Sequence, residues 1–175
     1  MQPSIRKKTA IFPGSSYVWS DISDFSNMPA RPVVNEIPAD RFTPIILGPS
    51  DTSNLQARGF CHTSQTDWLQ TAGGECVLTL FFAGEFHYIP MYMGMEHFVE
   101  VGRKVWHGAL NLSSRPAYCY NLLFRQGRKP HPRDYELRTL PYEHNLESAR
   151  RAQAQECRVI WNPRTHVETL VSGEF

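Results

Sequence analysis

Short strand-forming runs in the middle of the chain, over residues 57–124, constrain the fold more than any other feature. The runs are rich in β-branched and aromatic residues and cover residues 76–82, 98–102 and 116–124. Glycine or serine stands between them, at Gly84, Gly94, Ser113 and Ser114. No helical period of apolar residues appears in this region. Short strands at such spacing are typical of sandwiches and barrels, so we expect an all-β fold.

The flanking segments predict a single domain with three parts. The length of 175 residues is that of one ordinary domain. Residues 1–54 are punctuated by prolines and predict an extended N-terminal arm with one or two edge strands. Residues 55–141 are expected to form the core of the barrel. Residues 142–175 are expected to pack on that barrel as a C-terminal helix and strand.

The C-terminal part contains the one helix that the sequence predicts, over residues 145–157. Asn145 is its expected N-cap, and Glu147 lies in its first turn. The apolar face of this segment is thin and consists mostly of alanines, so we expect the helix to lie on the surface. Further strands are expected over residues 158–161 and 165–171.

Composition limits the class of partner. The chain has 18 Lys and Arg residues against 17 Asp and Glu residues, which gives a net charge of +1. This balance excludes a polybasic surface for nucleic acid. The longest uncharged apolar stretch, residues 77–84, is far shorter than the roughly 20 residues of a membrane helix. We therefore expect a small-molecule substrate, with neither nucleic acid nor a membrane as partner.

The cysteines and the N-terminus predict the compartment. Cys61, Cys76, Cys119 and Cys157 form no CxxC pair, and no apolar core follows the basic N-terminal residues. Zinc-ribbon, thioredoxin and secretory-signal patterns are therefore absent from the sequence. We expect a cytoplasmic protein with reduced thiols, at least two of them buried as small hydrophobic side chains.

A first motif lies over residues 58–67, which read RGFCHTSQTD. It begins with Arg58 and contains His62, Gln65 and Asp67, and the carboxylate stands five residues after the histidine. The glycine pair at residues 73–74 and a strand-forming run follow it. A histidine and a carboxylate ahead of a glycine turn are residue types suited to proton transfer or metal binding.

A second motif lies over residues 102–111, which read GRKVWHGALN. It contains Trp106, His107 and Asn111, and the asparagine stands four residues after the histidine. Arg115 and Pro116 follow, and then another strand-forming run begins.

Together the two motifs resemble the cupin family. They are similar, more narrowly, to sugar-epimerase-type cupins related to dTDP-4-dehydrorhamnose 3,5-epimerase, and residues 132–141 resemble the C-terminal extension of that group. The resemblance covers residues 55–141 and implies a double-stranded β-helix, a jelly-roll barrel with both motifs lining its interior. The sequence departs from the pattern at Phe60, where metal cupins carry a histidine. Arg103 and Lys104 stand where the pattern has Pro and Gly.

The resemblance implies an epimerase-like or isomerase-like enzyme that acts on a small carbonyl or sugar-type substrate and needs no cofactor. Under this interpretation His62 is the base that removes a proton next to a ketone, with His107 as a second catalytic histidine and Tyr120 as the acid. Adjacent strand residues face opposite ways, so only one of Tyr118 and Tyr120 points inward in a regular pairing. The residues expected to bind or orient the substrate are Arg58, Gln65, Asp67, Trp106 and Asn111.

Two alternatives remain open at the level of sequence. In the first, His62, Asp67 and His107 are ligands of one divalent metal (Zn, Fe, Ni or Mn), which would support dioxygenase, lyase or isomerase chemistry. In the second, the barrel binds a small molecule without catalysis. The proline-rich arm also predicts a homodimer formed through swapped or paired N-terminal strands. His87 and His97 are expected to be ordinary strand or loop residues.

Overall fold

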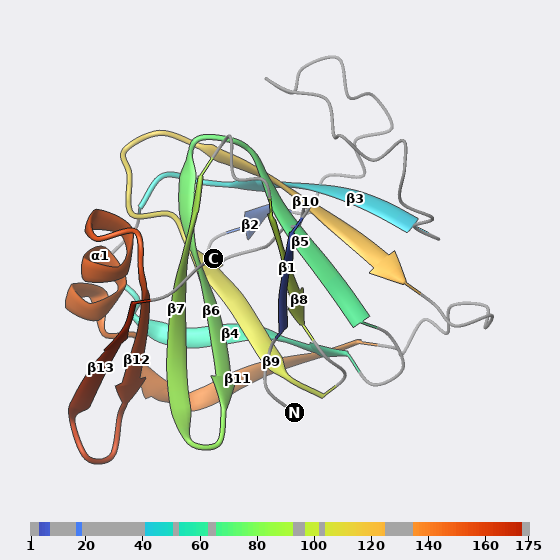
Figure 1. Ribbon diagram of the computed structural model, residues 1–175. Helices are drawn as coiled ribbons and strands as arrows, with labels where there is room; N and C mark the ends of the chain where they lie inside the picture. Colours follow the sequence, from blue (N-terminus) through green and yellow to red (C-terminus); the bar gives the residue numbers. More distant parts are fainter. Residues whose placement is uncertain are drawn as a thin grey trace.

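The computed structural model describes residues 4–7, 17–18, 41–50, 53–62, 66–92, 97–101, 104–124 and 135–172. These residues form two antiparallel sheets and one short helix, α1 (Leu146–Ala154) (Figure 1). The all-β prediction is therefore confirmed. Within the described residues, no helix is long and apolar enough to cross a membrane.

Sheet A has six strands and sheet B has seven. In spatial order, sheet A contains β1 (Ser4–Lys7), β8 (His97–Val101), β5 (Thr66–Gly73), β10 (Ala117–Phe124), β3 (Arg41–Leu47) and β2 (Tyr17–Val18). Sheet B contains β11 (Tyr135–Glu143), β4 (Gln56–His62), β9 (Trp106–Leu110), β6 (Glu75–Phe82), β7 (Glu85–Tyr92), β12 (Arg158–Asn162) and β13 (Val167–Val171). The described parts of the N-terminal arm thus supply both edges of sheet A, through β1 and β2, and one interior strand, β3.

The strand-forming runs of the sequence correspond to β6, β8 and β10. Strand β7 has no counterpart among the expected strands because His87 and Pro90 interrupt its apolar run. It pairs with β6 through a tight turn in which Ala83 and Gly84 both have positive φ, at 54° and 83°. Strand β11 crosses the expected boundary at residue 141, so the C-terminal part is continuous with sheet B.

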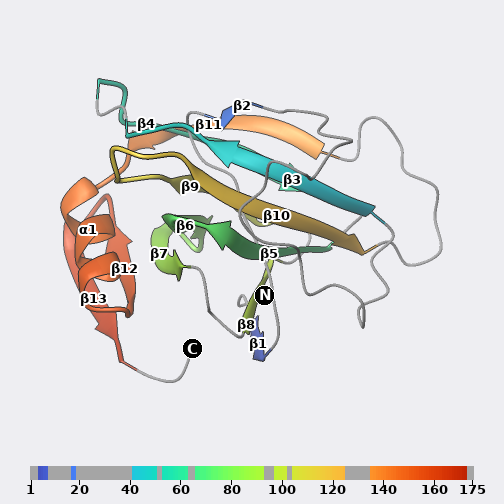
Figure 2. The same cartoon turned by 90° about the horizontal axis from the view of Figure 1, so that it is seen from above.

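Helix α1 begins where the sequence predicts. The Oδ1 atom of Asn145 accepts hydrogen bonds from the backbone N–H groups of Glu147 and Ser148, at 3.1 and 3.2 Å. The helix ends at Ala154, three residues before the expected end, and Glu156 has a left-handed φ of 48°. It lies over β7, β12 and β6 at one end of sheet B (Figure 2).

The alanine face of α1 turns out to be its buried face. Ala149 and Ala152 pack into a cluster on the face of sheet B beneath the helix, which we call the outer face. The buried members of this cluster are Ala57, Val77, Phe86, Tyr88, Trp106, Leu110, Ala149, Ala152 and Val159. Small side chains let a helix lie close to a sheet, so this thin apolar face packs directly onto the strands.

The outer face also buries two polar aromatic rings. Tyr88 is fully buried, and its hydroxyl accepts a 2.9 Å hydrogen bond from the backbone N–H of Asn145, at the start of α1. Burial raises the pKa of Tyr88 well above its usual value. His144 lies against Tyr88, Phe86 and Trp106, and burial lowers its pKa to about 4. Both rings are therefore uncharged at neutral pH.

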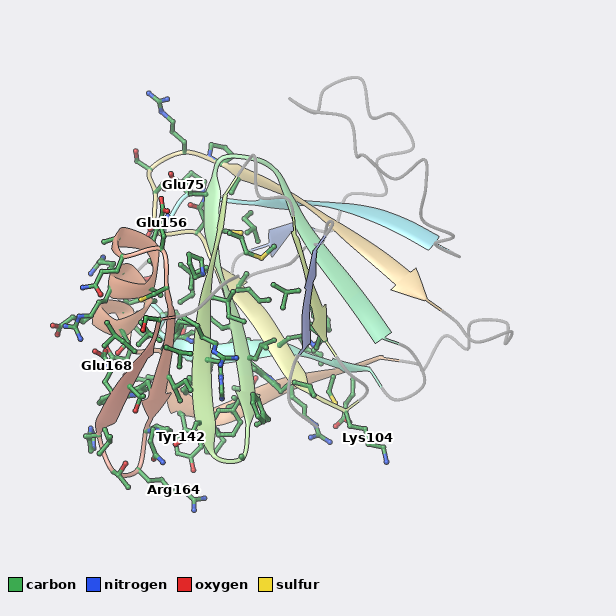
Figure 3. The ribbon with its side chains drawn as sticks, viewed as in Figure 1. Glu75, Lys104, Tyr142, Glu156, Arg164 and Glu168 are labelled. Atoms are coloured by element: carbon green, nitrogen blue, oxygen red, sulfur yellow. The ribbon has the colours of Figure 1, made fainter. Side chains whose placement is uncertain are left out.

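The C-terminal hairpin of β12 and β13 is tied to α1 by charged side chains (Figure 3). Glu168 on β13 accepts hydrogen bonds from Ser148 and Arg151 of the helix, and Arg151 also pairs with Glu147 at 2.8 Å. At the far end of the hairpin, Arg164 donates a 2.8 Å hydrogen bond from Nε to the hydroxyl of Tyr142 on β11. These contacts hold the hairpin and the helix in place over the outer face.

Sheet B is buried on its other face as well, which we call the inner face. Strand alternation places on it the residues that share a set with His107, and nine of them are buried. They are Phe60, Cys76, Leu78, Leu80, His87, Ile89, Met91, His107 and Ala109. Burial on both faces explains why the run at residues 76–82 is almost continuously apolar instead of alternating. The expectation of at least two buried cysteines is confirmed by Cys61 and Cys76.

Strands β4 and β9 meet closely at two glycines beneath the indole of Trp106. A Cβ atom added to Gly59 would lie 2.2 Å from the backbone oxygen of His107 and 2.8 Å from the Trp106 ring. A Cβ atom added to Gly108 would lie 2.9 Å from the backbone oxygen of Arg58. The indole nitrogen donates a 3.1 Å hydrogen bond to the carbonyl oxygen of Arg138 on β11. Trp106, on β9, thus contacts β4 and β11 as well, and it can do so because Gly59 and Gly108 carry no side chain.

We predict that Gly59→Ala lowers the free energy of unfolding by about 3 kcal/mol or more, because the new methyl group would displace the backbone of β9. Urea denaturation followed by tryptophan fluorescence would measure the loss. Gly84→Ala is the matched control: nothing lies within 4 Å of its added Cβ, and its φ of 83° leaves only local strain, which costs about 1 to 2 kcal/mol. Equal losses in the two variants would contradict the close approach.

Candidate functional site

The two sequence motifs meet on neighbouring strands of sheet B. Phe60 of the first motif, on β4, pairs directly with His107 of the second motif, on β9. His62 stands two residues after Phe60 and pairs with Tyr135 of β11. Alternate residues of a strand share a face, so the register assigns His62 to the same set as Phe60 and His107. The side chain of His62 itself lies outside the described ones.

His107 is the best-defined polar side chain of the inner face. Its exposed fraction is 1%, and its Nδ1 atom lies 2.9 Å from the backbone oxygen of Val105. A carbonyl oxygen only accepts hydrogen bonds, so Nδ1 carries the proton in this contact. In the neutral ring the lone pair therefore belongs to Nε2, the nitrogen suited to accept a proton or to bind a ligand.

Lys104 sets the turn from which β9 and His107 emerge. It is exposed (Figure 3) and has a left-handed φ of 61°. This is the position where the related sequence pattern has glycine, which adopts such a conformation without steric cost. Lys104 thus adopts a backbone conformation that favours glycine.

Asn111 organises the loop that follows β9. Its Nδ2 atom donates to the backbone oxygens of Gly48 at 2.8 Å and Arg115 at 2.6 Å, and lies 3.3 Å from that of Leu47. Its Oδ1 atom accepts from the backbone N–H and the hydroxyl of Ser113, at 3.0 and 2.8 Å. The structure therefore gives Asn111 a positioning role that ties β3 to the loop before β10.

The other residues expected to bind substrate lie in different places. Trp106 is on the outer face of sheet B, in the cluster beneath α1 and on the side opposite His107. Arg58 lies on β4 in the same alternation set as Phe60, and its side chain is exposed. Gln65 lies outside the described residues.

Asp67 and Tyr120 lie on sheet A, and the strand register assigns them to opposite alternation sets. Asp67 on β5 pairs with Val101 on β8, which is buried. Tyr120 on β10 pairs with Gln70 of β5, which belongs to the other alternation set. Tyr118 shares the set of Tyr120. The side chains of Asp67, Tyr118 and Tyr120 are not among the described ones, so their roles stay predictions.

The metal alternative requires three ligands that converge. Among the described side chains, no three His, Cys, Asp or Glu residues are grouped closely enough to hold a metal ion. The proposed set depends on His62 and Asp67, whose side chains lie outside that part. The chemistry of His107 fits a ligand, because a backbone carbonyl accepts from its Nδ1–H and the lone pair of the ring then belongs to Nε2.

His87 is a buried histidine to which the sequence analysis gave no role. It lies on β7 with an exposed fraction of 5%, and burial, together with the charge of Arg158, lowers its pKa to about 4. Its ring stacks on Phe82 with centroids 4.2 Å apart. Neither ring nitrogen has a hydrogen-bond partner in the structure of the described residues. Its alternation with Ile89 and Met91 would have placed it inward, had β7 been recognised as a strand.

Comparisons with known proteins show distant structural likenesses. No protein-family model matches the chain, and no curated protein sequence matches it. A 3,4-ketoisomerase from Helicobacter canadensis has a TM-score of 0.48 and 15% identity, over 78% of this chain and 90% of its own. A variant of a 3,4-ketoisomerase from Thermoanaerobacterium thermosaccharolyticum, in complex with TDP-4-keto-6-deoxyglucose, has a TM-score of 0.47 and 14% identity, over 77% and 86%.

A dTDP-4-dehydrorhamnose 3,5-epimerase from Elizabethkingia anophelis NUHP1 is more distant, with a TM-score of 0.34 and 10% identity, over 56% of this chain and 75% of its own. It is the type of enzyme that the two sequence motifs resemble. At these TM-scores and identities, the likenesses assign neither a family nor an activity to this chain.

We predict that Lys104→Gly raises the free energy of unfolding by about 1 kcal/mol, because glycine relieves the left-handed strain at this position. Lys104→Ala removes the same side chain but keeps the strain, so it serves as the control and should bring no gain. Chemical denaturation of the three proteins would measure the differences. Equal stability of the glycine and alanine variants would contradict a left-handed backbone at residue 104.

Proposed function

We propose that this protein is an isomerase-like or epimerase-like enzyme that moves a proton next to the carbonyl group of a sugar-type substrate. The observation that carries the proposal is the meeting of the two motifs on the inner face of sheet B. There the register aligns His62 with Phe60 and His107, and the carbonyl of Val105 fixes His107 as the Nδ1–H tautomer. Nε2 of such a ring is a proton acceptor held in one orientation.

The proposed chemistry balances without a cofactor. A base removes the proton from a carbon next to the ketone, and the electron pair of that C–H bond forms an enolate with the carbonyl. Return of a proton to the opposite face of the same carbon inverts its configuration. Where that carbon carries a hydroxyl group, the former carbonyl oxygen takes up a proton and the hydroxyl group loses one, and proton return to the former carbonyl carbon then moves the ketone by one position. Either route leaves the substrate at the same oxidation level.

Two histidines and a tyrosine are the candidates for these proton transfers. His62 is the proposed base, because it lies in the same strand set as His107 and belongs to the first motif. His107 is the second proton carrier. Tyr120 is the proposed acid, and its variant Tyr120→Phe assigns that role. Loss of product formation with proton exchange retained makes Tyr120 the acid, whereas full retention gives the role to the second histidine.

We predict that the protein exchanges deuterium from D₂O into a ketosugar at the carbon beside the carbonyl. TDP-4-keto-6-deoxyglucose is the first compound to test. Proton NMR of the sugar and the mass of the recovered compound would follow the exchange. His62→Asn and His107→Asn should each slow it by about 100-fold or more, the usual contribution of a general base.

The control for these variants is His166→Asn. His166 is an exposed histidine in the β12–β13 turn with a φ of 57°, a conformation that asparagine tolerates well. This variant should exchange deuterium as fast as the unaltered protein. Unchanged exchange in both His62→Asn and His107→Asn would contradict the proposed mechanism.

Metal content of protein purified without chelator, measured by mass spectrometry, separates the proposal from the metal alternative. About one ion per chain, lost in both His62→Asn and His107→Asn, would replace the proton-transfer roles by ligand roles. Substrate binding without any exchange or turnover would instead support a binding protein.

A further inference from the structure

We propose that His87 contacts the ligand from the same inner face as His107, with its imidazole hydrogen-bonding a hydroxyl group of a sugar-type ligand. This inference rests on the proposed function for the location and class of the ligand. It adds a residue on β7, a strand outside both sequence motifs, to the site.

The strand register places the two histidines on either side of one leucine. Leu80 on β6 pairs with His107 on β9 on one side and with His87 on β7 on the other. Residues directly opposite one another share a face, so all three belong to the inner face. Two strand spacings separate the backbones of the histidines by about 10 Å. Imidazole rings that extend from these positions can contact different oxygens of one sugar.

The polar atoms of His87 are buried without partners. The ring has an exposed fraction of 5%, and within the described structure neither Nδ1 nor Nε2 forms a hydrogen bond. Ile160 pairs with His87 on the side away from Leu80, so its two cross-strand neighbours are both apolar. Buried polar groups in native proteins are almost always hydrogen-bonded. A ligand that supplies the missing partners would account for keeping a histidine where leucine would fit the surroundings better.

The state of the ring defines the chemistry that it can recognise. Burial and the charge of Arg158 lower the pKa of His87 to about 4, so the ring is neutral at neutral pH. A neutral imidazole offers one N–H donor and one lone-pair acceptor. A hydroxyl group, which both donates and accepts, complements it, whereas a phosphate or carboxylate could use only the donor. Stacking on Phe82, at 4.2 Å and 22°, limits rotation of the ring.

The test compares binding of TDP-4-keto-6-deoxyglucose and of TDP alone, by calorimetry, to the unaltered protein and to its variants. His87→Leu should weaken binding of the sugar nucleotide at least 10-fold and leave TDP binding unchanged, because TDP lacks the hydroxyl groups of the ketosugar. His87→Asn keeps a donor and an acceptor and should restore part of the loss. His166→Asn should bind both compounds as the unaltered protein does.

Thermal unfolding distinguishes a ligand contact from a structural role. If His87 acts on the ligand, His87→Leu keeps or raises the melting temperature, because it removes buried polar atoms that lack partners. Unchanged sugar-nucleotide binding in His87→Leu would overturn the inference and leave His87 as a core residue. A lower melting temperature with equal losses for both compounds would overturn it as well.

The inference and the proposed function can fail separately. If the unaltered protein binds the sugar nucleotide but exchanges no deuterium, the proposed function fails, and the binding data alone decide the role of His87. If deuterium exchange proceeds and His87→Leu leaves binding and exchange unchanged, the inference fails alone. Absence of sugar-nucleotide binding by the unaltered protein would contradict both.

Discussion

The close approach of β4 and β9 is the constraint on which the candidate site depends. Gly59 and Gly108 leave room for the Trp106 indole on the outer face, and the same approach sets Phe60 opposite His107 on the inner face. A side chain at either glycine would force the strands apart and move the two motifs out of register. The residues that hold the site together thus lie on one side of sheet B, and the residues proposed to act lie on the other.

Both faces of sheet B are buried. The outer face is covered by α1 and the C-terminal hairpin, which the ion pairs of Arg151 and Glu168 hold in place. With that cover, Trp106, Tyr88 and His144 are packed away from solvent. The inner face can then carry polar groups such as His107 and His87 without also supplying the main apolar core of this sheet.

Strand-forming runs, the helix start and the all-β class could be predicted from local pattern. Asn145 caps the helix because side-chain capping is a local interaction, readable from the sequence. Trp106 was expected to bind substrate. It directly precedes His107 on β9, so its side chain lies on the opposite face of the sheet, and this could be predicted only once β9 is known to be a strand. Asn111 was expected to bind substrate, and its amide hydrogen-bonds the backbone at the end of β3, which is distant in sequence, and the loop that directly follows β9. His87 was missed because β7 was not recognised as a strand, and its place beside Leu80 follows only from the pairing of β7 with β6.

The most direct test of this account is the tautomer of His107 in solution. Long-range ¹H–¹⁵N correlation NMR of protein labelled with ¹⁵N-histidine reports which ring nitrogen carries the proton, and His107→Asn assigns the signals. The account predicts that His107 carries its proton at Nδ1, held by the Val105 carbonyl, with the lone pair on Nε2. A ring protonated at Nε2 would contradict it, because the nitrogen proposed to accept the substrate proton would already carry one.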